Sequence, residues 1–157
     1  MKRPSDNMHQ FNLTALALFE KLYASFPTPI DFRPSHVGID AAPPDASYEQ
    51  AFNFGAEARH VVSWLEEEGF LRTGSIDKAG YYLQVRLTMR GLTILGSVPS
   101  ALQAQEARTP IIGRVKKVLV AGTEKAGTEA AKALVSEIFR LSLQYGAPFA
   151  AAASMSV

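Results

Sequence analysis

Hydrophobic positions in the first part of the chain recur with helical spacing. Apolar residues return every three or four positions between Leu13 and Phe26, which is the period of one helix face. Pro27 and Pro29 follow and cannot continue a helix. Next, the alternation over residues 30–32 predicts a short strand, and the proline-rich residues 33–46 predict a long loop.

A second run of patterns begins at Ser47. Ser47 and Gln50 have the spacing of a capping box, so a short helix should start there and end near Phe52. Residues 53–55 suit a turn. An apolar stripe with helical period follows and predicts a second helix, with Ala58, Val61, Val62 and Leu65 facing the core.

Glycine and threonine mark the boundaries of the elements that follow. Gly69 should end the second helix, because a residue without Cβ adopts the left-handed conformation of a helix cap. A strand is expected from Phe70, a hairpin tip over residues 73–80 and a returning strand over residues 81–87. Thr88 should then cap another helix that runs to residue 95.

From residue 99 the chain becomes rich in Ala, Gly and Thr. Small and apolar residues recur at heptad spacing and predict a helical extension over residues 98–146. We expect its seam to pair with a second copy and form a homodimer through Leu134, Ile138, Leu141 and Tyr145. Residues 1–10 and 147–157 should be flexible.

The helix that ends at Gly69, the hairpin and the helix after Thr88 together resemble the second half of a winged helix-turn-helix domain. The resemblance covers residues 47–95 and, more loosely, 11–32. It implies a mainly α fold with a small β-hairpin wing, formed by residues 11–97 and followed by the helical extension. It also implies a dimeric, DNA-binding transcriptional regulator.

In this family the helix before the glycine is the recognition helix and the hairpin is the wing. Carried over by position, the candidate DNA contacts are Arg59, His60 and Ser63 on the helix and Arg72 and Lys78 on the wing. Arginine can donate two hydrogen bonds to guanine, and histidine can donate to phosphate.

Charge favours a competing interpretation. Residues 1–99 hold nine Lys/Arg and eleven Asp/Glu, a net charge of −2, whereas residues 100–157 hold seven and four, a net of +3. A DNA reader usually carries a basic face. The alternative is therefore a protein–protein interaction module whose exposed helix docks another protein. Membrane-surface association through residues 111–143, which include the basic run 114–117, is a weaker third possibility.

Other chemistries find little support. The chain has no cysteine, no Gly-x-Ser-x-Gly motif and no glycine-rich phosphate loop, so we expect no enzyme activity and no cofactor. His36 and Asp40 are metal-ligand types four residues apart, but a loop would not align them and no metal site is expected. Trp64, the only tryptophan, should pack under the wing or against the C-terminal helices.

The sequence also bears on location. No secretory signal follows residue 1, and no apolar run reaches the roughly 18 residues that would suggest a spanning helix. We therefore expect a cytoplasmic protein without a membrane partner.

Overall fold

A computed structural model describes residues 4–97, 109–120 and 125–155. The chain is mainly helical with a small antiparallel sheet. In order, its elements are α1 (Pro4–Ser25), β1 (Ile30–Phe32), α2 (Pro34–Ala41), α3 (Tyr48–Glu67), β2 (Leu71–Arg72), β3 (Ser75–Ile76), β4 (Tyr82–Leu87), α4 (Met89–Gly96), α5 (Ile111–Val120) and α6 (Lys125–Met155).

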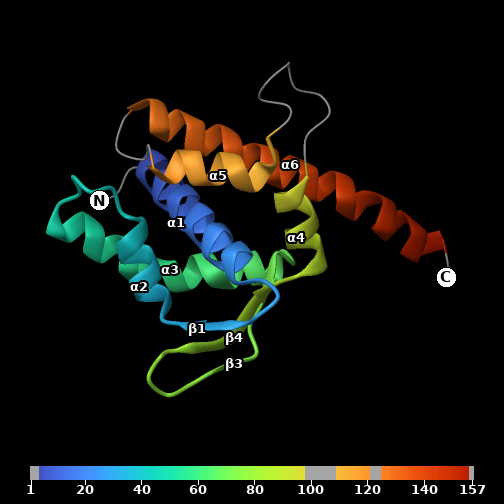
Figure 1. Ribbon diagram of the computed structural model, residues 1–157, viewed down its shortest axis with the longest axis horizontal. Coiled ribbons are helices and arrows are strands. Elements are labelled where there is room, and N and C mark those ends of the chain that lie inside the picture. The colour runs from blue at the N-terminus through green and yellow to red at the C-terminus, as the bar shows by residue number, and fades with distance from the viewer. Residues whose placement is uncertain (1–3, 98–108, 121–124, 156–157) are drawn as a thin grey trace.

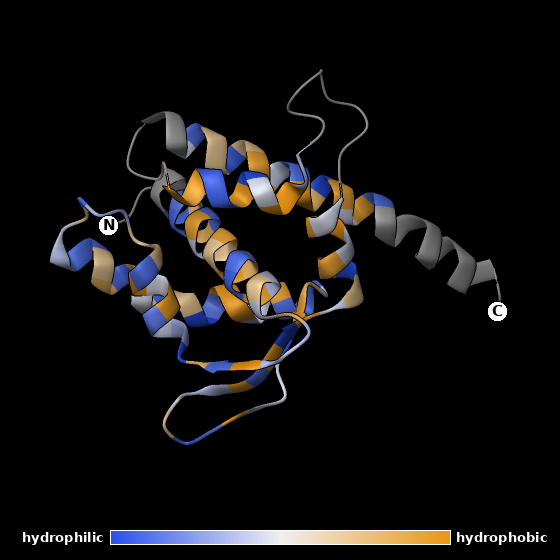
Figure 2. Ribbon diagram, viewed as in Figure 1, coloured by the Kyte–Doolittle hydropathy of each residue, from blue (hydrophilic) through white to orange (hydrophobic). Residues whose placement is uncertain are grey.

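Helix α1 lies at the centre of the molecule (Figure 1). Helices α5 and α6 pack on one side of it, and α2 and α3 pack on the other. Hydrophobic residues occur along most of α1 (Figure 2), and its Leu16 and Phe19 are fully buried. One hydrophobic core joins residues of α1 to residues of every other helix and of the sheet.

Helix α1 begins earlier than its apolar pattern indicated. Residues 4–10, expected to be flexible, form its first turns. Gln10 is buried, and its side-chain amide donates a hydrogen bond of 2.8 Å to the carbonyl oxygen of Asn53 in α3. Packing against α3 therefore orders a polar segment that carries no strong helix signal of its own.

Helix α2 occupies the segment predicted to be a loop, so that prediction was wrong. Pro34 starts the helix, where its missing N–H is not needed. Val37 and Gly38 are buried against α3. A Cβ atom on Gly38 would lie 2.2 Å from the carbonyl oxygen of Phe54, so glycine is what allows the two helix backbones to approach.

Helix α3 is continuous from Tyr48 to Glu67. The capping box at its start is confirmed, because Ser47 Oγ accepts from the Gln50 N–H and Gln50 Oε1 accepts from the Ser47 N–H. The predicted turn at residues 53–55 is wrong, since Phe54 and Gly55 are buried inside the helix. Burial against α2 outweighs the turn tendency of these residues.

The predicted glycine cap at the end of α3 is confirmed. Gly69 has a φ of +84°. Its N–H donates to the carbonyl of Glu66, and the N–H of Phe70 donates to the carbonyl of Leu65. These two bonds satisfy carbonyl groups of the last helical turn.

The sheet is organised around β4, which pairs antiparallel with β1, β2 and β3. The predicted strand at residues 30–32 and the predicted hairpin are both present. Gln84 interrupts the pairing with a φ of +56°, and the register between β1 and β4 shifts there. The Asp31 carboxylate accepts a 2.8 Å hydrogen bond from the Gln84 N–H, which satisfies the backbone group at the irregularity.

Helices α5 and α6 confirm that the C-terminal segment is helical, and α6 continues to Met155 through residues expected to be flexible. An ion pair of 2.7 Å joins Arg114 of α5 to Glu137 of α6. Arg90 of α4 donates to the carbonyl oxygens of Glu68, at 3.1 Å, and Ser142, at 3.0 Å. Polar contacts thus supplement the apolar packing of the extension.

The predicted dimer seam is covered within a single copy of the chain. Leu134, Ile138 and Leu141 are buried in the common core, whereas the side chain of Tyr145 lies outside the described residues. Because α6 packs on α1, α4 and α5, its apolar stripe needs no second copy. A homodimer stays a prediction, and it would have to use another surface.

Candidate nucleic-acid interface

A groove lies between α3, the start of α2 and the β3–β4 hairpin. We call it the wing groove. Its volume is about 630 Å³, and it is lined by Arg33, Pro34, Ser35, Gly55, Ala56, Arg59, Ile76, Ala79, Gly80 and Tyr82. Two arginines contribute to this described lining and no carboxylate does. The groove therefore offers positive charge to an anionic partner.

Arg33 connects the start of α2 to the tip of the hairpin. Its Nε donates to the carbonyl oxygen of Ala79 at 3.1 Å, and its Nη2 donates to the same oxygen. Its guanidinium carbon lies 5.2 Å from the centroid of the Tyr81 ring. These contacts fix the hairpin relative to α2, and they leave the positive charge without a carboxylate partner among the described residues.

Arg59 projects from the middle of α3 and is exposed. Gly55 and Ala56, one turn earlier, are small and keep the helix surface low beside it. Ser63 is exposed one turn later, and residues four apart lie on the same face of a helix. Arg59 and Ser63 thus form one polar face.

The tip of the hairpin is built by Asp77. Its Oδ1 accepts 2.9 Å hydrogen bonds from the N–H groups of Ala79 and Tyr81. Aspartate commonly closes turns in this way. Asp77 is therefore explained by turn geometry, and Lys78 is left exposed beside it at the tip.

His60 lies on a different side of α3 from Arg59. It lines a second groove of about 710 Å³, which we call the α1–α3 groove, together with Asn7, Gln10, Phe11, Asn53, Glu57, Val61 and Trp64. Successive residues of a helix are rotated by about 100°, so neighbours in sequence face different surfaces. The structure consequently places both His60 and Glu57 away from the wing groove.

Arg72 lines neither the wing groove nor the α1–α3 groove. It stands directly opposite Arg86 on the paired strands β2 and β4, and both line a hollow of about 280 Å³ near the start of α4. Sequence reasoning missed Arg86. Its alternation with buried Val85 and Leu87 marks it as outward-facing, but only the register shows which residue it faces.

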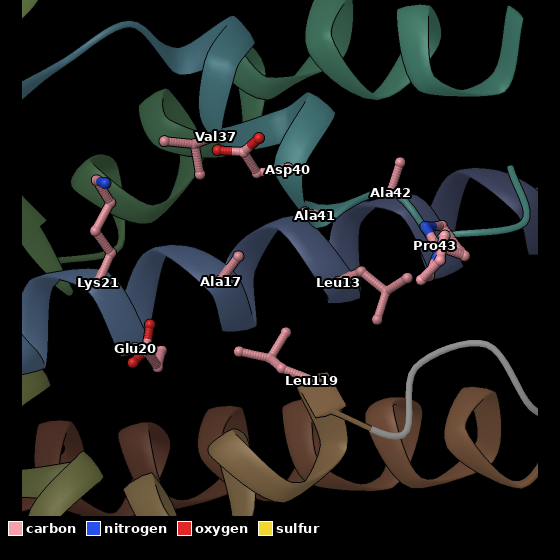
Figure 3. A pocket seen from close by; sticks show the side chains of 11 residues that line it. Leu13, Ala17, Glu20, Lys21, Val37, Asp40, Ala41, Ala42, Pro43 and Leu119 are labelled. Carbon is pink, nitrogen blue, oxygen red and sulfur yellow. The ribbon is translucent and has the colours of Figure 1, made fainter. Parts of the chain in front are cut away.

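A fourth hollow, of about 360 Å³, lies between α1, α2 and α5. Figure 3 shows Leu119 pointing from α5 toward α1, with Glu20 and Lys21 at one end of the hollow and Leu13 at the other. Asp40 also lines it. Charges of both signs surround an apolar floor, so the hollow has no clear preference for a cation or an anion.

Contrary to the prediction from the sequence, His36 and Asp40 do not lie in a loop. Both residues belong to α2, which places them one turn apart, and both are exposed. Among the described residues, however, no group of three or more His, Cys, Asp or Glu side chains is placed to hold a metal ion.

Trp64 packs against a C-terminal helix, which is one of the two arrangements that the sequence predicted. Its ring centroid lies 5.2 Å from that of Phe139 in α6 and 5.4 Å from that of Phe11 in α1. Even so, 39% of the residue remains exposed, on the side of the α1–α3 groove.

No protein-family model, curated protein or solved structure matches this chain. Within the described ranges, no helix combines the length and apolar character needed to cross a membrane. The geometry of the grooves is therefore what indicates a function.

Proposed function

We propose that this protein is a non-enzymatic, DNA-binding transcriptional regulator of the winged-helix type, with α3 as the recognition helix. The order α1, β1, α2, α3, followed by a hairpin of short strands, supports this proposal. It departs from the sequence-based interpretation in one respect: the helix that precedes the recognition helix is α2.

The observation that carries the proposal is the charge of the wing groove. Arg33 and Arg59 line it, and no carboxylate does among the described residues, although residues 1–99 have a net negative charge. Phosphate contacts from arginine and lysine supply most of the affinity of a protein for duplex DNA. Local charge at the contact surface matters more for such binding than the net charge of the segment.

The shape of this region also suits a duplex. An isolated α-helix fits the major groove of B-form DNA, and Arg59 and Ser63 share one exposed face of α3. The hairpin tip, with Lys78, flanks that face and is held by Arg33. In the proposed complex Arg59 and Ser63 face base edges or phosphates, while Lys78 contacts the backbone.

The proposal is tested by measuring binding to random duplex DNA over a range of salt concentrations. Affinity should fall steeply with salt, and Lys78→Ala should flatten the log–log slope by about 0.9 for one lost phosphate contact. Lys132→Ala, on the exposed surface of α6, is the matched control and should leave the slope unchanged. No retardation of duplex at low salt, with folded protein in excess, would refute the proposal.

The alternative, a protein-interaction module, is favoured by a different observation. Tyr48 and Phe52, one turn apart on α3, are 89% and 61% exposed, and Ile39 of α2 is also exposed. Large exposed apolar side chains often mark protein contacts. If Phe52→Ser leaves the affinity for DNA intact, this patch is separate from the DNA surface. If the wild-type protein does not bind duplex DNA, the patch becomes the leading candidate for the functional surface.

A further inference from the structure

One wall of the α1–α3 groove is aromatic. Core packing does not require this wall to stay exposed. Phe11 and Trp64 meet edge to face, with ring planes at 88°. Trp64, the only tryptophan, keeps 39% of its surface exposed. A tryptophan ring carries a large apolar area, so exposure on this scale favours a contact surface over simple packing.

The position of the Trp64 ring is fixed from behind. Phe139 of α6 lies 5.2 Å from it and 5.8 Å from Phe70, centroid to centroid. Phe70 is itself fully buried. Because these rings belong to the core, the exposed side of Trp64 is held in place before any ligand arrives, which reduces the entropy lost on binding.

The charge of this groove is opposite to that of the wing groove. Glu57 lies on its wall, seven residues before Trp64 on the same helix, and none of the described residues that line it is a lysine or arginine. Among the described residues Glu57 forms no ion pair. The remaining polar lining is amide and imidazole, from Asn7, Gln10, Asn53 and His60.

We propose that the α1–α3 groove binds a small organic cation that carries an aromatic ring. A cation is attracted both to a carboxylate and to the negative face of an aromatic ring. The groove volume of about 710 Å³ lies in the range of small-molecule sites. The neutral ring of such a ligand stacks on Trp64 and meets the perpendicular Phe11 ring edge to face, while its ammonium group lies near Glu57.

This site is independent of the proposed DNA surface. It uses Glu57 and Trp64, whereas the wing groove uses Arg59 and Arg33. Ligand binding can therefore be measured on the protein alone, and a failure of DNA binding would not affect the result.

The experiment uses Trp64 as its own probe, because all tryptophan fluorescence of the chain comes from this groove. The protein is titrated with three ligands that share a phenyl ring: benzyltrimethylammonium, benzyl alcohol and benzoate. We expect saturable fluorescence change with the cation, about tenfold weaker binding of the neutral alcohol, and no binding of the anion.

Two variants distinguish the contribution of the Glu57 carboxylate to binding from a general effect on the fold. Glu57→Gln should weaken binding of benzyltrimethylammonium about tenfold and leave binding of benzyl alcohol unchanged. Glu49→Gln is the matched control, since Glu49 is exposed on the same helix and outside the groove; it should change neither. Equal affinity for all three ligands, no effect of Glu57→Gln on the cation, or no saturation by the cation at about 10 mM would each overturn the proposal.

Discussion

Two glycines occupy positions where a side chain has no room. A Cβ atom on Gly38 would lie 2.2 Å from the carbonyl oxygen of Phe54, and one on Gly91 would lie 2.3 Å from that of Phe70. Gly91 also donates its N–H to the Thr88 hydroxyl at the start of α4. The Thr88-x-x-Gly91 spacing is thus explained by capping and close packing at one point.

Gly38→Ala should destabilise the protein by about 1–3 kcal/mol, because the added methyl group forces α2 and α3 apart. Gly96→Ala is the control: its Cβ would meet only Tyr23 Oη, at 3.5 Å, and the free energy of unfolding should change by less than about 1 kcal/mol. Urea denaturation measures both. An unchanged midpoint for Gly38→Ala would contradict the observed separation of the helices.

The ion pair between Arg114 and Glu137 is mostly shielded, with side-chain exposures of 24% and 10%. Arg114→Ala leaves the Glu137 carboxylate shielded and unpaired, and should lower the free energy of unfolding by about 1–3 kcal/mol. Arg140→Ala, at an exposed position on α6, the helix of Glu137, should lower it by less than about 0.5 kcal/mol. Equal effects in thermal or urea unfolding would show that the pair contributes nothing.

At the scale of the element, α3 presents two chemically different sides. Arg59 lines the wing groove with Arg33, whereas His60 and Glu57 line the α1–α3 groove with Trp64. The sequence placed Arg59 and His60 in one contact set because neither belongs to the apolar stripe that faces the core. Helical rotation separates them, and only the packing of α1 and the hairpin shows which surface each one faces.

Arg59→Ala and His60→Ala should therefore behave differently in DNA binding. Arg59→Ala should weaken binding and flatten the salt dependence by about 0.9 in log–log slope, while His60→Ala should leave both unchanged. Salt titrations of the two variants side by side provide the measurement. Equal losses would mean that a single surface of α3 includes both residues.

At the scale of the whole molecule, the C-terminal helices belong to the same core as the N-terminal elements. Ile138 of α6 and Leu16 of α1 are both fully buried within it. The elements over residues 4–97 therefore do not close their core alone, and α6 covers a surface of α1 that would otherwise be exposed.

Ile138→Glu should consequently unfold the entire chain, because an unpaired buried carboxylate costs several kcal/mol against a total stability of about 5–15 kcal/mol. Leu143→Glu is the matched control on the same helix, since Leu143 is 73% exposed, and it should stay folded. Circular dichroism measures folding. A folded Ile138→Glu monomer formed from a wild-type dimer would restore the original seam hypothesis.

Leu143→Glu also tests the homodimer prediction at the outer face of α6. If the wild-type chain is a dimer by light scattering and this variant is a folded monomer, the exposed side of α6 is the interface. A dimer that persists in the variant would exclude that side.

The sequence by itself determined the features whose cause lies within a few residues. The capping box at Ser47, the glycine cap at Gly69 and the threonine cap at Thr88 all form short-range hydrogen bonds. Alternation was enough to predict the strand at residues 30–32, whereas β3 lies within the residues predicted to form the hairpin tip. Tertiary structure alone decided that α2 is a helix, that α3 is unbroken at Gly55, and that α6 packs within its own chain. The physical reason is that these outcomes depend on which surfaces meet: burial against a distant helix outweighs local turn tendency, and no local pattern specifies the partner of an apolar stripe.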